Sequence, residues 1–157
     1  MSELFTSNAG LVALALRDLI KNLGPENVSD EEVQVRGSWL NTDGNPHVGI
    51  SVVPLGEQAD PGTIGTQDIG YVMSIVFVEK DSYDARMTDD QMLAWRELVR
   101  RRLTDQRLEV TITNQTDPSE HVCRISRSGE SLRNPNKYPT FNINRMVVVV
   151  WLRELNP

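Results

Sequence analysis

The feature that most constrains the fold is an unbroken run of seven apolar residues near the end of the chain. The segment RMVVVVWLREL covers residues 145–155, and positions 146–152 carry no polar side chain. A membrane-spanning helix needs about 20 apolar residues, so the run is too short for one. A strand with one face in water would alternate apolar and polar residues. The run therefore predicts a central or near-central strand that is covered on both faces.

The two faces of this strand carry different side chains, because successive residues of a strand point to opposite sides. One face has Val147, Val149 and Trp151, and the other has Met146, Val148, Val150 and Leu152. We expect helices to cover one face. For the other face we expect a polar segment, an extended arm or another subunit, which makes Val148 and Val150 candidates for a subunit interface.

Two segments predict helices. In residues 7–25 the apolar side chains recur at helical spacing, at Val12, Leu16, Leu19, Ile20 and Leu23. Ser7 or Asn8 can cap its start, and Gly24 before Pro25 predicts its end, with glycine in the left-handed conformation. The second helix is expected over residues 88–103, with a capping box of Thr88 and Gln91. Its buried stripe is Met92, Trp95, Val99 and Leu103.

The remaining apolar segments predict strands over residues 33–40, 47–54, 69–80 and 108–112, besides the final strand from residue 141. A Gly- and Pro-rich segment at 56–68 predicts an extended, exposed arm. Residues 114–140 form a polar excursion in which only HVCRIS, at 121–126, could pair as a strand. Strands outnumber helices without regular alternation. We therefore expect one α+β domain over residues 1–157, with a mostly antiparallel or mixed sheet packed on two main helices and with long loops.

Charge and cysteine content narrow the class of protein. The net charge is −6 and the pI is about 4.9, which argues against general, charge-driven binding to nucleic acid. A single cysteine, Cys123, excludes an intramolecular disulfide, so folding needs no oxidising compartment. The start of the chain lacks the pattern of a secretory signal peptide. We expect a cytoplasmically made protein without a membrane segment.

No catalytic arrangement is evident among the reactive residue types. His121 and Cys123 would share one side of a strand, but zinc sites need further Cys or His ligands, and only His47 is left. A Cys–His nucleophile pair at this spacing would lack an orienting third group. The carboxylates between residues 79 and 90 fit a solvated turn and a helix start. We therefore predict no enzyme activity, no metal and no cofactor.

The densest positive charge lies in the second predicted helix. Arg96, Arg100, Arg101 and Arg102 can complement the helix dipole in water, or they can contact DNA phosphates or an acidic face of a neighbour. Together with the exposed arm, these arginines favour a role in assembly. The candidate interface residues are Arg96, Arg100, Arg101, Arg102, Asp60, Thr63, Ile64, Val148 and Val150.

The order of these elements resembles a known family. HVGISVVP precedes GYVMSIVFVEKDSYDARMTDDQMLAWRELVRRRL, which has an apolar strand, an acidic turn and a capped helix with a basic end. A closing strand follows near residue 154. The pattern is similar to the tail terminator proteins of long-tailed bacteriophages, also called minor tail or head–tail joining proteins, over residues 47–103 and 141–154. The excursion at 114–140 is longer than is common in that family.

The resemblance implies a structural virion protein that is assembled in the host cytoplasm and resides in the tail or neck. It implies a homo-oligomeric ring, usually a hexamer, that ends the tail tube, binds a neck protein and lets DNA pass through its lumen. The arm at 56–68 would reach a neighbour or the tube. Two alternatives stay open: another head–tail connector, such as a head-closure or tail-completion protein, and a binding module that uses the arginine-rich helix.

Overall fold

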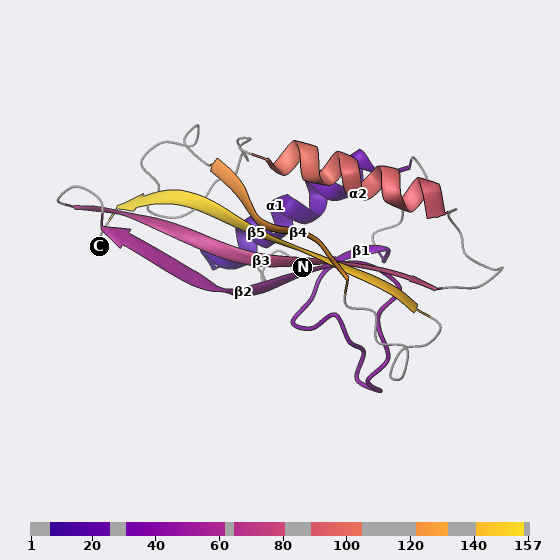
Figure 1. Cartoon of the computed structure of the whole chain (residues 1–157). Helices are drawn as coiled ribbons and strands as arrows, with labels where there is room; N and C mark the ends of the chain where they lie inside the picture. Colours follow the sequence, from indigo (N-terminus) through magenta and orange to yellow (C-terminus); the bar gives the residue numbers. More distant parts are fainter. Residues whose placement is uncertain are drawn as a thin grey trace.

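The computed structural model is an α+β fold in which two helices cover one face of a mixed sheet (Figure 1). It describes residues 7–25, 31–61, 65–80, 89–104, 122–131 and 141–155. The elements in chain order are α1 (Asn8–Leu23), β1 (Val33–Val35), β2 (Gly49–Pro61), β3 (Thr66–Lys80), α2 (Asp89–Leu103), β4 (Val122–Ser131) and β5 (Phe141–Leu155). The predicted fold class is confirmed.

The sheet has the strand order β1-β2-β3-β5-β4. β1 runs parallel to β2, and the other neighbouring pairs are antiparallel. The apolar run lies in β5, which pairs with β3 along its whole length and with β4 on its other side. The prediction of a near-central final strand is therefore confirmed.

The ends of α1 follow from its sequence, with one correction. The Ser7 hydroxyl accepts a hydrogen bond from the Gly10 N–H at 3.0 Å, as a helix cap should. Gly24 ends the helix in an extended conformation, with φ of −84°, so the expected left-handed conformation is wrong. Glycine is needed there for space, because a Cβ atom at Gly24 would lie 2.6 Å from the ring of Trp95.

Trp95 joins the two helices. Its ring is buried and its Nε1–H donates to the Ile20 carbonyl of α1 at 2.9 Å, so burial leaves the indole nitrogen with a partner. Val99 and Leu103 are buried on the same face of α2, as predicted. The expected capping box and the side chain of Met92 lie outside the described residues, as does the strand predicted at 108–112.

The helices cover the face of β5 that carries Val148 and Val150. Both side chains are fully buried in one core with Leu16 and Ile20 of α1 and Val99 of α2. Buried valines cannot contact a neighbouring subunit while the chain is folded. Val148 and Val150 are therefore core residues, and we do not retain them as interface candidates.

Part of the opposite face of the sheet is covered by a segment that the sequence did not indicate. The loop after β1 lies on the side of the sheet away from the helices (Figure 1), and its Trp39 and Leu40 pack on a small cluster of Val76, Val78 and Ile143. Residues 36–40 were expected to continue the first strand, but β1 ends at Val35.

Arg36 holds this loop in place. Its guanidinium donates to the Ser38 carbonyl at 3.1 Å, to the Gln34 side chain at 3.1 Å and to the Asn41 side chain at 3.0 Å. Its backbone N–H donates to the Val52 carbonyl of β2. The loop thus covers the sheet around Val78 and Ile143, whereas the cover expected over Val147 and Val149 stays a prediction.

Two further segments differ from the sequence prediction. The 56–68 segment is largely strand: β2 continues to Pro61 and β3 begins at Thr66, with Asp60 opposite Asp68. Residues 62–64 between them, including Thr63 and Ile64, lie outside the described residues. The 114–140 excursion contains β4, so the predicted strand is confirmed over residues 122–126 and continues to Ser131, while His121 is not described.

Candidate functional site

The first candidate surface is the end of the sheet that lies beyond the helices, at the left of Figure 1. We call it the hairpin, and it comprises residues 54–61 of β2 and 66–68 of β3. Its strands pair continuously from Gly56 opposite Val72 to Pro61 opposite Gln67. The side chains from Pro54 to Ala59 are all exposed, and Leu55 is 55% exposed. The hairpin thus presents an apolar side chain and the carboxylate of Glu57 to solvent.

One edge of β2 in the hairpin has no neighbouring strand among the described residues. β1 pairs only with Ile50, Ser51 and Val52, whereas β3 pairs with β2 as far as Pro61. An unpaired strand edge is a template for pairing with another strand. Pro54 and the register shift between Pro54 and Gly56 make this edge of β2 less regular. This edge is therefore accessible to another chain, but not as a flat, uninterrupted surface.

The base of the hairpin is fixed to the rest of the fold by polar contacts. The Tyr71 hydroxyl donates to Glu154 of β5, and the Asn8 side chain at the start of α1 donates to the same carboxylate at 2.9 Å. Burial, followed by the hydrogen bond to Glu154, raises the pKa of Tyr71 above its usual value. Arg153 and Asp68 add an ion pair at 3.0 Å. The hairpin therefore leaves the body of the protein in a defined direction.

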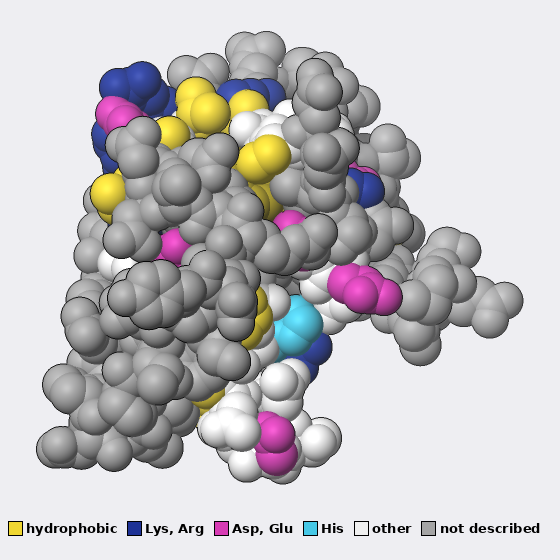
Figure 2. All heavy atoms as spheres, turned by 90° about the vertical axis from the view of Figure 1, so that its right-hand side faces the viewer, with side chains coloured by type: hydrophobic (Ala, Val, Ile, Leu, Met, Phe, Trp, Pro, Cys, Tyr) yellow, Lys and Arg dark blue, Asp and Glu magenta, His cyan; other side chains and the backbone are white. Residues whose placement is uncertain are grey.

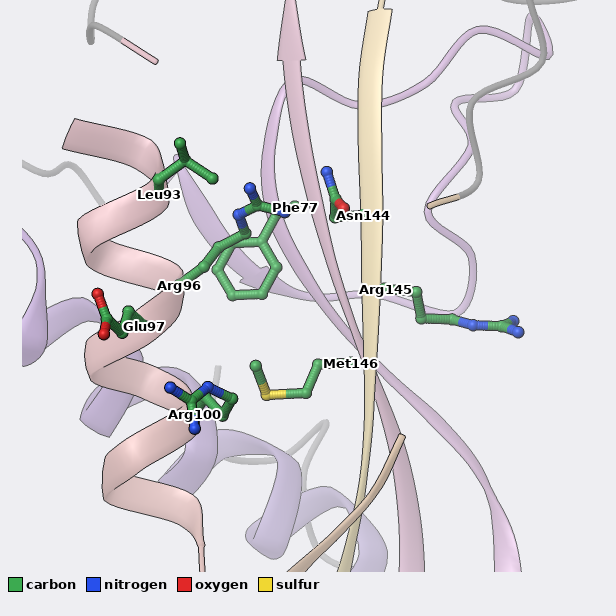
Figure 3. Close-up of a pocket in the computed structure, with 8 residues that line it drawn as sticks. All are labelled: Phe77, Leu93, Arg96, Glu97, Arg100, Asn144, Arg145 and Met146. Atoms are coloured by element: carbon green, nitrogen blue, oxygen red, sulfur yellow. The ribbon is translucent and has the colours of Figure 1, made fainter. Parts of the chain in front are cut away.

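The second candidate surface is a cavity of about 400 Å³ between α2 and the sheet. We call it the arginine cavity. Figure 3 shows Phe77 and Met146 pointing from the strands toward α2, and Arg96 reaching from α2 toward the strands. Arg145, although it borders the cavity, points to the other side of the sheet. The full lining is Phe77, Leu93, Arg96, Glu97, Arg100, Asn144, Arg145 and Met146.

Arg96 is the most distinctive group of the arginine cavity. Its Nε–H is buried and has no hydrogen-bond partner. Burial lowers the pKa of Arg96, and the charge of Glu79 acts in the opposite direction. Because a guanidinium keeps its proton under ordinary conditions, the cavity holds a positive charge with an unused donor. A buried donor without a partner is unfavourable, so an anionic or hydrogen-bond-accepting group in the cavity would be stabilised.

The other predicted interface arginines are in different environments. Arg101 pairs with Glu97 of the preceding turn at 2.6 Å, and both side chains are exposed. Arg100 is exposed at the cavity, and Arg102 is half-buried. Asp60 lies in β2, on the hairpin, and its side chain is not described. The structure thus brings Arg96 and Arg100 together at one cavity and places Asp60 at the far end of the sheet.

Sequence reasoning missed the apolar wall of the arginine cavity. Phe77 and Met146 were assigned to strands without a site role, and Leu93 was not considered. The available signal was the alternation of β3 and β5, which places Phe77 and Met146 on the same face as Met73 and Val148. That signal cannot show that the helix leaves a space above two of these side chains, because the space depends on how α2 packs.

Arginine and apolar side chains also lie side by side on the end of the molecule shown in Figure 2, in its upper part where α2 runs. Among the described side chains of α2, the large apolar ones that are exposed are Leu93, at 52%, and Leu98, at 45%. His47, the cyan residue of that view, belongs to the loop after β1, and burial, followed by the nearby Arg36, lowers its pKa. His47 does not line the arginine cavity, so it has no part in that site.

Other kinds of site receive no support from the described residues. Within them, no group of three or more His, Cys, Asp or Glu side chains could hold a metal ion. The side chain of Cys123 is not described, so the expected pairing with His121 stays a prediction. Neither α1 nor α2 is long and apolar enough to cross a membrane.

The hairpin and the arginine cavity therefore remain as the two candidate interaction surfaces of the described chain. Comparison with known proteins adds no assignment: no protein-family model matches the chain, and no curated protein is significantly similar in sequence.

Proposed function

We propose that the protein is a structural component of a bacteriophage particle that forms a homo-oligomeric ring at the end of the tail tube. In this role it stops tube growth, binds the neck and lets DNA pass through the lumen. The ring is a hexamer, as the family resemblance implies. The protein has no catalytic role and needs no cofactor.

The observation that carries the proposal is the hairpin. Ordering a chain segment has an entropic cost of about 1–2 kcal/mol per residue, which burial normally offsets. In the hairpin the side chains from Pro54 to Ala59 remain exposed, although their backbone is paired in long strands. The hairpin is thus an ordered extension of the sheet whose side chains are exposed. Such an extension suits a contact with another chain, since strand edges and exposed apolar side chains mark interaction surfaces.

The experiment is to purify the protein and to examine it by native mass spectrometry and negative-stain electron microscopy. We expect a ring of uniform subunit number, or a ring that forms on addition of the tail tube protein and caps the tube end. A uniform monomer that neither assembles nor binds tube protein at any concentration would refute the proposal.

A variant with a shortened hairpin sharpens this experiment. Replacing residues 60–68 with Asn-Gly would close β2 and β3 by a two-residue turn directly after the pair Ala59 and Ile69, which is a favoured hairpin connection. We expect a folded protein that no longer caps the tube. Normal capping by this variant would show that the hairpin end is not the contact surface.

A further inference from the structure

The hairpin and the arginine cavity are complementary in charge. The hairpin strand PLGEQADP carries Glu57 and Asp60 and no cation. The α2 segment LAWRELVRRRL carries four arginines and one acidic residue, Glu97, which already pairs with Arg101. In a chain with a net charge of −6, this concentration of cations beside a cavity is a specific feature.

The two surfaces are also complementary in their apolar parts. The arginine cavity joins the guanidinium groups to an apolar wall of Phe77, Met146 and the half-exposed Leu93. A suitable occupant therefore combines an acidic with an apolar side chain. The hairpin carries both kinds of side chain, in the exposed Glu57 and in the exposed Leu55 at the bulge after Pro54.

These surfaces cannot meet within one molecule. Glu57 lies opposite Tyr71 in the sheet, whereas the arginine cavity is bordered by Phe77, six residues further along β3. At about 3.3 Å per residue, this separation is about 20 Å along the strand, which exceeds the reach of the side chains involved. The hairpin can therefore enter the arginine cavity only of another copy.

We propose that the hairpin of one subunit docks at the arginine cavity of the next subunit, where Glu57 pairs with Arg96 and Arg100. The contact joins different surfaces at opposite ends of the sheet, so it repeats from copy to copy. Contacts of this head-to-tail kind close into rings when the rotation permits. The contact specifies which surfaces build the proposed ring, and it rests on that proposal.

Reversing the charge on each side tests the contact. We expect Arg100→Glu and Glu57→Arg each to raise the concentration needed for assembly about 100-fold or more, because like charges would then face each other. Arg101→Glu is the matched control, since it makes the same charge change on the same helix at a residue that does not line the cavity. Circular dichroism and thermal unfolding of each variant verify that the fold is retained.

Mixing the two variants gives the decisive result. In the mixture the hairpin of the Glu57→Arg chain faces the cavity of the Arg100→Glu chain, and the remaining native hairpin faces the remaining native cavity. Both contacts are attractive, so we expect rings with strictly alternating chains in a 1:1 ratio by native mass spectrometry. A closed alternating ring also requires an even number of subunits.

The outcomes separate this contact from the proposed function. If the wild type forms rings and both single variants assemble as it does, the contact is wrong while the ring proposal stands. If the single variants fail and their mixture stays monomeric, the contact is also wrong. If the mixture forms alternating rings that do not bind the tail tube, the contact is correct and the proposed function fails.

Discussion

The part of the sheet under the helices and the hairpin are built from the same strands but differ in what covers them. Under the helices, Met73 and Ile75 of β3 are fully buried, together with Ile50 and Val52 of β2. In the hairpin, β2 carries Glu57 and Gln58, and both are exposed. Backbone pairing continues from one part into the other without a break except at the bulge after Pro54.

This comparison shows that backbone pairing and side-chain burial have different roles in this chain. Burial of apolar side chains under α1 and α2 supplies the driving force for folding, at about 25 cal/mol per Å². The hairpin adds paired backbone with little such burial, so it depends on the covered part for its order. Changes in the covered part should therefore lower stability, and changes in the hairpin should affect assembly alone.

The largest effect is expected from Trp95→Ala in the covered part. The substitution removes a buried ring and leaves the Ile20 carbonyl without its donor, so we expect the free energy of unfolding to fall by about 3–5 kcal/mol. Chemical denaturation measures this change. Leu98→Ala is the control, because Leu98 lies on the same helix with 45% of its surface exposed, and its loss should have little effect. Equal effects of both substitutions would contradict the packing of α2.

A second pair of substitutions compares the same change in both parts. A Cβ at Gly70 would lie 2.9 Å from Val149 Cγ1 and 3.0 Å from the Trp151 ring, whereas a Cβ at Gly56 would meet nothing within 4 Å. We expect Gly70→Ala to lower the free energy of unfolding by about 1–3 kcal/mol. Gly56→Ala should leave stability unchanged or raise it slightly, because alanine restricts the unfolded chain. Thermal unfolding of the two variants measures both changes in stability. A larger loss for Gly56→Ala than for Gly70→Ala would refute the assigned packing around Gly70.

The covered part was the easier part to predict from the sequence. The helical spacing of Val12, Leu16 and Ile20 predicted α1, and the two-sided apolar run predicted a near-central β5. These signals work because burial itself selects the residues. The loop cover by Trp39 and Leu40 was missed, because Trp39 was read as the end of a strand. Only the tertiary contacts with Val76, Val78 and Ile143 distinguish the two possibilities.

The hairpin was harder to predict, because its order comes from neighbouring backbone and not from its own side chains. Pro54, Gly56 and Pro61 are turn signals, so a flexible arm was the natural reading of residues 56–68. Pairing with β3 overrides these local preferences. The arginines of α2 were singled out as candidates from the sequence, but their division into the ion-paired Arg101 and the cavity-lining Arg96 and Arg100 required the packing of α2 on Phe77 and Met146.

An effect of similar size is expected at the boundary between the two parts. Tyr71→Phe removes a hydrogen bond to the Glu154 carboxylate, so we expect a loss of about 1.5–3 kcal/mol in the free energy of unfolding. The pKa of Tyr71 is raised in the folded state, so its contribution is complete below about pH 10, the usual tyrosine pKa. It is lost as the pH rises above that value, because the unfolded chain releases this proton first.

Unfolding curves of the wild type and of Tyr71→Phe at neutral and high pH measure this effect. The stability difference between the two proteins should shrink as the pH rises above about 10. Asn8→Ala is a useful companion, since it removes the second donor to Glu154 and leaves the tyrosine in place. A stability difference that stayed constant with pH would show that Tyr71 contributes only through packing.

The smallest effect on stability, and the largest on assembly, is expected from Glu57→Arg in the hairpin. Glu57 is exposed, so its replacement should change the free energy of unfolding by no more than about 0.5 kcal/mol. Chemical denaturation at a concentration below that of assembly isolates the monomer for this measurement. A loss of several kcal/mol there would mean that the hairpin side chains contribute to the fold of the single chain. In that case the contacts within one chain would account for the ordered hairpin without a partner. The division of the sheet into a part that drives folding and a part that drives assembly would then be wrong.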